Sequence, residues 1–333
     1  MELLRIVAIS MIVLGHFLTH AIKANIGLGS YFALESIFVD GVNLFFLISG
    51  WFTVKFSIKS FVRLLVVVMC FTTVALIALI VAGVQPDYES YVKSLILPVS
   101  GNSYWFVMVY MVLMVLAPLL NAGLSNLSST QLSRLVVMFS AVNIFSCWFG
   151  GNYTNVNGYT IMQAIWMYML AYWFRLHSHG ISRINRNWYL AIFILVSLIS
   201  SIHNYYYQHH SFIYYNSPYT VISSLSLFLY FTQLNFRNVA VNYIAKAAFG
   251  CYLLQDGMFG FKYMYWAVRN LYTEFLNAYG ITYGKILTGA VIFVIFILIW
   301  LSSMLLTPLI NRLGTYLGMK VSSLVTLFRK KYC

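Results

Sequence analysis

The chain has 333 residues, of which 61% are hydrophobic, 18% are aromatic and only 8% are charged. A soluble domain carries about 25% charged residues, so this composition excludes a soluble globular protein. The net charge of +13 comes from basic residues scattered over short loops, with no basic domain. That pattern excludes a nucleic-acid-binding protein and indicates anchoring in a membrane that contains anionic lipid.

Apolar runs of membrane-spanning length recur along the chain, and they predict an all-α polytopic membrane protein with about ten transmembrane helices. The predicted spans centre near residues 12, 46, 72, 111, 142, 166, 195, 227, 250 and 297. Ten spans put both termini on one side together with fifteen of the twenty lysines and arginines, which predicts cytoplasmic termini. The other side receives only Lys23, Lys93, Lys262, Arg269 and Lys285. We expect one membrane-embedded domain over residues 1–333, with a short interfacial tail at about 312–333.

The first span contains an arginine and a histidine on one helix face. Arg5 and His16 are eleven residues apart, which is about three turns at roughly 100° per residue. Their separation along the axis is about 16 Å, half of a roughly 30 Å hydrocarbon core. His16 is therefore expected near the midplane, where an ionisable residue is costly and is by default a functional candidate. The alternatives are a structural hydrogen bond for His16, and for Arg5 a membrane anchor or an ion pair with Glu2.

The second span begins VDGVNLFFLISGWF, in which two glycines bracket an aromatic pair and two polar residues. Small residues let helices approach closely, and Ser49 can bond across to a neighbouring helix. Asp40 lies where a carboxylate stabilises the N-terminus of this helix. Taken alone, the motif indicates a tight packing face.

Polar residues elsewhere are weaker candidates. Lys59 and Arg63 follow the second span, and membrane anchoring is favoured over ligand binding for both. His20 lies one turn beyond His16 on the same face. Asp256 lies near the end of its span, where ligand binding and a helix-to-helix hydrogen bond explain its presence equally well. The four cysteines show no metal spacing, and we expect no metal site.

Together these motifs carry a family resemblance. An Arg–ten residues–His first span followed by GVNLFFLISG closely resembles the integral-membrane acyltransferase-3 family. The stretches YWFVMVYMVLMVLAPLL at 104–120 and AFGCYLLQ at 248–255 are also similar to the family pattern. The chain departs from that pattern in two places. Lys59 and Arg63 are spaced one residue wider than the usual basic pair, and Gln255 with Asp256 stand where many members have a histidine.

The resemblance implies acyl transfer, usually of acetyl, from cytoplasmic acyl-CoA to a hydroxyl of an exported or lipid-linked carbohydrate. It also implies a bacterial cytoplasmic (inner) membrane and a role in modifying cell-envelope polysaccharide. In this reading acyl-CoA is a donor substrate and no cofactor is bound permanently. The residues suit the chemistry, because a sugar hydroxyl needs a general base and the ordinary pKa of histidine is about 6.5.

The expected roles follow from these positions. His16 is the predicted base, and Arg5, Lys59 and Arg63 are the predicted donor-site residues. Predicted substrate-binding residues are Asn43, Phe46, Ser49, His20 and Asp256. The rival hypothesis is a non-enzymatic transporter of a sugar, lipid or proton-coupled substrate, since such proteins also carry intramembrane Arg and His. The pattern shows no inverted repeat, which counts mildly against that rival. The oligomeric state is not predicted.

Overall fold

The computed structural model describes residues 1–85, 92, 104–150, 154–208, 210–257 and 260–332. These residues are mainly helical, with turns and loops between the helices and no strand among them, which confirms the predicted all-α class. Seven helical segments of this part of the chain are long and apolar enough to cross a membrane. They are Glu2–Asn25, Leu28–Phe52, Ile58–Val81, Trp105–Asn126, Ser129–Phe149, Arg186–Tyr207 and Tyr265–Phe328.

The predicted count of about ten spans is therefore not confirmed. The spans expected near residues 166, 227 and 250 correspond to shorter helices of 16, 15 and 8 residues. At 1.5 Å per residue, even 16 residues extend only about 24 Å, which is less than a roughly 30 Å hydrocarbon core. These helices are α8 (Ile161–Leu176), α11 (Pro218–Thr232) and α13 (Ala248–Gln255). The positions of the termini relative to the membrane stay a prediction.

The chain divides into two compact units, residues 1–54 with 116–245 and residues 55–115 with 246–333. The first unit begins with α1 (Glu2–Phe17), which continues through a π-helical turn (Leu18–Ile22) and a 3-10 turn (Lys23–Asn25). Before α8 the unit also contains α2 (Leu28–Phe38), α3 (Gly41–Phe52), the second half of α6 (Trp105–Asn126) and α7 (Ser129–Ala141). A π-helical segment (Val142–Phe149) follows α7. After α8 come α9 (Ser178–Ile181), α10 (Arg186–Tyr207), α11 and most of α12 (Val239–Lys246).

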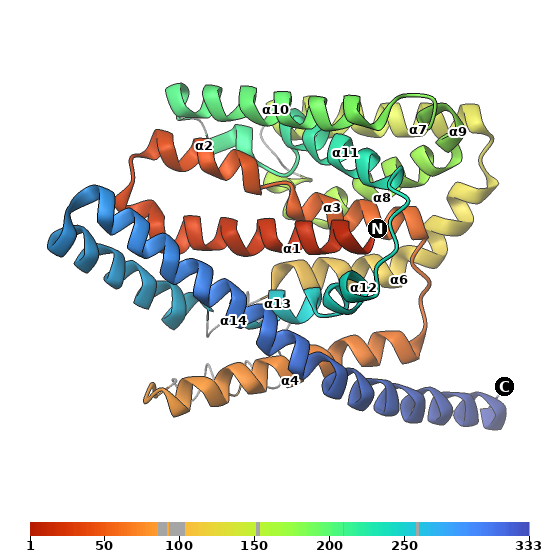
Figure 1. Ribbon diagram of the computed structural model, residues 1–333. Helices are drawn as coiled ribbons and strands as arrows, with labels where there is room; N and C mark the ends of the chain where they lie inside the picture. Colours follow the sequence, from red (N-terminus) through yellow and green to blue (C-terminus); the bar gives the residue numbers. More distant parts are fainter. Residues whose placement is uncertain (86–91, 93–103, 151–153, 209, 258–259, 333) are drawn as a thin grey trace. The chain divides into compact units, whose positions relative to one another are not determined.

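Two glycines let α3 pack closely in this unit. A Cβ on Gly41 would lie 2.6 Å from the carbonyl oxygen of Ala8 on α1, and a Cβ on Gly50 would overlap the backbone of Tyr168 on α8. The helix α3 thus lies directly against both neighbours, while α2 runs along α10 (Figure 1). The packing face that the glycines predicted is confirmed.

The second unit contains α4 (Ile58–Val81), α13, a π-helical turn (Gly260–Met264) and α14 (Tyr265–Tyr332). It also contains the first half of α6 (Trp105–Asn126). Gly280 has a φ of 75°, and the chain reverses there. The reversal brings Gly284 close to Leu276, so that a Cβ on Gly284 would lie 2.9 Å from the backbone nitrogen of Leu276. The longer arm of α14 then crosses α4 and continues to Tyr332, through the segment predicted as a tail (Figure 1).

Candidate functional site

Arg5 and His16 both lie on α1, as predicted. Arg5 donates from Nη1 to both carboxylate oxygens of Glu2, at 2.8 and 3.0 Å, so the ion pair considered from the sequence is present. The two side chains are 37% and 34% exposed, which leaves part of the guanidinium accessible. His16 is half-buried, and its ring centroid lies 5.7 Å from that of His20, edge to face.

A carboxylate that sequence reasoning missed lies beside this turn of α1. Thr19 donates from Oγ1 to Oε2 of Glu35 at 3.2 Å, and the two oxygens of Glu35 lie 3.8 and 4.0 Å from where a Cβ on Gly15 would be. Glu35 is on α2, within an apolar stretch that reads YFALESIFVDG. A signal was available, because the chain has only seven acidic residues and an acidic residue in such a stretch is costly.

Asn43 belongs to a buried network of side-chain amides. Its Nδ2 donates to the carbonyl oxygen of Tyr215 at 2.9 Å, and its Oδ1 accepts from Nε2 of Gln163 at 3.0 Å. Gln163 in turn accepts from Nδ2 of Asn155 at 2.9 Å. All three amide side chains are fully buried. Satisfied networks of this kind fix helices in one arrangement, so Asn43 ties α3 to α8 and to the segment before α11.

The other second-span residues are also internal. Phe46 is fully buried and Ser49 is 7% exposed. Ser49 donates to the carbonyl oxygen of Phe45, within α3, rather than across to a neighbour. Asp40 stands at the N-cap of α3, but its Oδ1 accepts hydrogen bonds of 2.6 Å from both Ser223 and Ser224 of α11.

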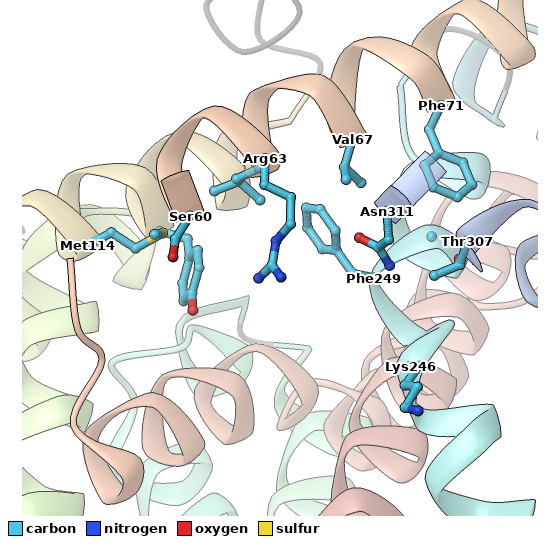
Figure 2. A pocket seen from close by; sticks show the side chains of 12 residues that line it. Ser60, Arg63, Val67, Phe71, Met114, Lys246, Phe249, Thr307 and Asn311 are labelled. Carbon is cyan, nitrogen blue, oxygen red and sulfur yellow. The ribbon is translucent and has the colours of Figure 1, made fainter. Parts of the chain in front are cut away.

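The second unit holds a cavity of about 230 Å³ between α4, α6, α13 and α14. Figure 2 shows the guanidinium of Arg63 directed into it from α4, with Lys246 on the opposite wall and Asn311 contributed by α14. Apolar side chains, among them Val67, Phe71 and Phe249, line the rest. The cavity therefore combines two cations and several polar groups with apolar side chains.

Lys59 and Arg63 differ in their relation to this cavity. Both have exposed side chains, but only Arg63 lines the cavity. The backbone of Lys59 packs against α14, where a Cβ on Gly318 would lie 2.6 Å from the Lys59 carbonyl oxygen. Lys246 was not singled out from the sequence, although it lies two positions before the AFGCYLLQ motif.

Asp256 is 2% exposed and directly follows α13. Its Oδ1 accepts from the backbone nitrogen of Gly257 at 3.1 Å, and the preceding Gln255 accepts from the hydroxyl of Tyr265. Asp256 thus shapes the turn that ends α13.

The candidate residues fall into two groups. The first unit contains His16, Arg5, His20, Asn43, Phe46 and Ser49. The second unit contains Lys59, Arg63 and Asp256.

Comparison with known protein families shows to which family this chain belongs. A family model described as an acyltransferase domain matches residues 1–307, and the chain therefore belongs to the integral-membrane acyltransferase-3 family. No curated protein and no solved structure matches it significantly. The apolar helices and the family together make it a multi-pass membrane acyltransferase by class.

Proposed function

We propose that the protein is an O-acyltransferase that moves an acyl group, most simply acetyl, from cytoplasmic acyl-CoA to a hydroxyl of an exported or lipid-linked carbohydrate. The proposed location is the inner membrane of a bacterium, where the product modifies cell-envelope polysaccharide. The observation that carries the proposal is the basic cavity of the second unit, in a chain whose family transfers acyl groups.

The cavity suits the donor because coenzyme A joins phosphate groups to an uncharged chain. Arg63 and Lys246 supply two positive charges, and guanidinium binds phosphate oxygens by paired hydrogen bonds. Val67, Phe71 and Phe249 provide an apolar wall for the chain that carries the thioester. A volume of about 230 Å³ is below the usual range for ligand pockets, so the cavity accommodates part of the donor. Acyl-CoA is a substrate here, and no permanent cofactor is proposed.

His16 is the proposed general base. When the acceptor hydroxyl attacks the acyl carbonyl carbon, its proton moves to the imidazole as the new C–O bond forms. The bond from the acyl carbon to its leaving group breaks, and for coenzyme A this leaving group is the thiolate, which takes up a proton. The chemistry of this attack is the same whether transfer is direct or passes through an acyl-enzyme. A positioned base of this kind contributes about 10²- to 10⁴-fold.

The remaining predicted residues keep supporting roles in the proposal. Arg5 stays a donor-site candidate, held in place by Glu2. The side chains of α3 that were predicted to bind substrate are buried rather than on an open surface: Asn43, Phe46 and Ser49. His20, beside His16, is proposed to line the path of the acceptor, and Asp256 stays a proposal for binding acceptor hydroxyls.

The test is thiol release from acetyl-CoA by membranes containing the protein, with a crude glycan fraction as acceptor. His16→Ala is compared at equal abundance with Arg5→Ala and with His179→Ala, a matched control on an exposed histidine. We expect His16→Ala to lose at least 100-fold, Arg5→Ala to weaken the dependence on donor concentration, and His179→Ala to match wild type. A wild type that binds no acyl-CoA and releases no thiol would favour the transporter hypothesis. Full activity in His16→Ala would exclude its role as base.

A further inference from the structure

Polar and ionisable side chains that the proposed reaction does not use gather beyond the end of α1, from its continuing turns, from α2 and from the segment before α8. They are Thr19, Lys23, Tyr31, Glu35 and Tyr159, which we call the Glu35 cluster. All of these residues belong to the first unit, as do His16 and His20.

The contacts within the cluster converge on Thr19 and Tyr31. The hydroxyl of Thr19 donates to Glu35 Oε2 at 3.2 Å and lies 3.3 Å from the hydroxyl of Tyr31. The ammonium of Lys23 stands 4.5 Å above the ring of Tyr31. One side of α1 presents Gly15 and Thr19 to α2, and the next presents His16 and His20. Glu35 therefore contacts the face of α1 that adjoins the face carrying His16 and His20.

Tyr159 brings a second wall to the cluster. Its ring centroid is 4.9 Å from that of Tyr215. Burial of the phenol is the main cause that raises the pKa of Tyr159, and the negative charge of Glu35 is a smaller one. Tyr159 is 48% exposed, and Glu35, His16, His20 and Lys23 are all half-buried, so the cluster is accessible along one edge.

Glu35 does not serve as a salt-bridge partner in this arrangement. The one ion pair between residues that the structure describes is Arg5 with Glu2. Among the same residues, no three His, Cys, Asp or Glu side chains gather as metal ligands. A carboxylate that accepts from the Thr19 hydroxyl, with the hydroxyl of Tyr31 and the ammonium of Lys23 next in line, matches the chemistry of polyol binding. Carboxylates accept strong hydrogen bonds from hydroxyls, and tyrosine offers both a ring face and a hydroxyl.

We propose that Glu35 binds hydroxyl groups of the carbohydrate acceptor next to His16, and that the Glu35 cluster is the acceptor site. This inference rests on the proposed function, since the acceptor site would hold the sugar whose hydroxyl His16 deprotonates. Glu35 is an acceptor-binding residue in this proposal, and it takes no part in proton transfer.

The experiment uses the purified full-length protein and an oligosaccharide fraction released by mild acid from the envelope of the expressing cells. Two quantities are measured for wild type and Glu35→Gln: equilibrium binding of the end-labelled fraction, and the acceptor and donor KM in the thiol-release assay. Glu274→Gln, on an exposed glutamate of α14, is the matched control. Thr19→Val removes the Thr19 bond to Glu35 while keeping the charge, and thermal midpoints check folding in every variant.

We expect Glu35→Gln to bind the oligosaccharides about 10- to 100-fold more weakly, as for the loss of hydrogen bonds to a charged group. Its donor KM should stay within about twofold of wild type, and Thr19→Val should show a smaller loss in the same direction. Unchanged oligosaccharide binding in Glu35→Gln, or equal losses toward donor and acceptor, would overturn the inference.

The two proposals fail separately. Thiol release by wild type together with unchanged oligosaccharide binding in Glu35→Gln refutes the acceptor site alone. Oligosaccharide binding that depends on Glu35, in a wild type that releases no thiol, refutes the acyl-transfer reaction and leaves a sugar site. A wild type that binds none of the oligosaccharides refutes the acceptor site.

Discussion

Replacing Arg63 by glutamine removes one of the two positive charges of the cavity in the second unit while keeping a polar side chain of similar reach. Arg63 and Lys59 are one helical turn apart on α4, and both are exposed, but only Arg63 lines the cavity. Lys59→Gln is therefore a control matched in charge, helix and exposure. Donor binding by the cavity predicts that the two variants differ.

The size of the effect follows from the exposure of Arg63. Hydrogen bonds to charged groups contribute about 1.5–3 kcal/mol, but exposed charges are screened by solvent and contribute less. We expect Arg63→Gln to lose about 1–1.5 kcal/mol of donor binding, which is about a 5- to 12-fold increase in Kd. Lys246→Gln should cause a similar loss, because Lys246 lines the opposite wall. Lys59→Gln should change the Kd less than twofold.

The measurement is equilibrium binding of acetyl-CoA to the purified protein at low and high salt. The wild-type Kd should rise with salt as the phosphate contacts are screened, and Arg63→Gln should reduce that dependence. An equal effect of Lys59→Gln and Arg63→Gln would mean that the cationic surface of α4 acts without the cavity. No effect of either variant would refute the assignment of the donor site to this unit.

Two further predictions concern stability, measured by thermal unfolding in detergent. Gly250→Ala should lower the free energy of unfolding by about 1–3 kcal/mol, because its Cβ would lie 2.6 and 2.9 Å from two cavity-lining side chains. The control Gly289→Ala has open space around it and should leave that free energy unchanged or slightly higher. Asp40→Ala should cost about 1–3 kcal/mol, because Ser223 and Ser224 both lose their acceptor. Asp40→Asn keeps an oxygen there and should stay within about 1 kcal/mol of wild type; equal losses in Ala and Asn would show that the carboxylate charge itself is required.

Several features of the site were readable from local sequence. The placement of Arg5 and His16 on one helix follows from their spacing, and the glycines of the second span predicted close packing, which Gly41 and Gly50 make. These predictions succeeded because helical periodicity and the absence of a side chain act over a few residues. The count of ten spans is not confirmed, and the reason is the opposite one. Hydropathy marks an apolar segment but not the residue at which its helix ends, so an 8-residue helix such as α13 was read as a full span.

The sequence by itself determined that this is a helical membrane protein of the acyltransferase-3 family, because hydropathy, charge bias and motif spacing are properties of contiguous residues. Tertiary structure alone decided which polar groups meet. Asn43 pairs with Gln163, 120 positions away, and Glu35 lies against the turn of α1 that carries His16. Arg63 enters a cavity while Lys59, one turn earlier, does not. Such partners come from helices distant in the chain, and only their packing in three dimensions selects among side chains that local patterns leave equivalent.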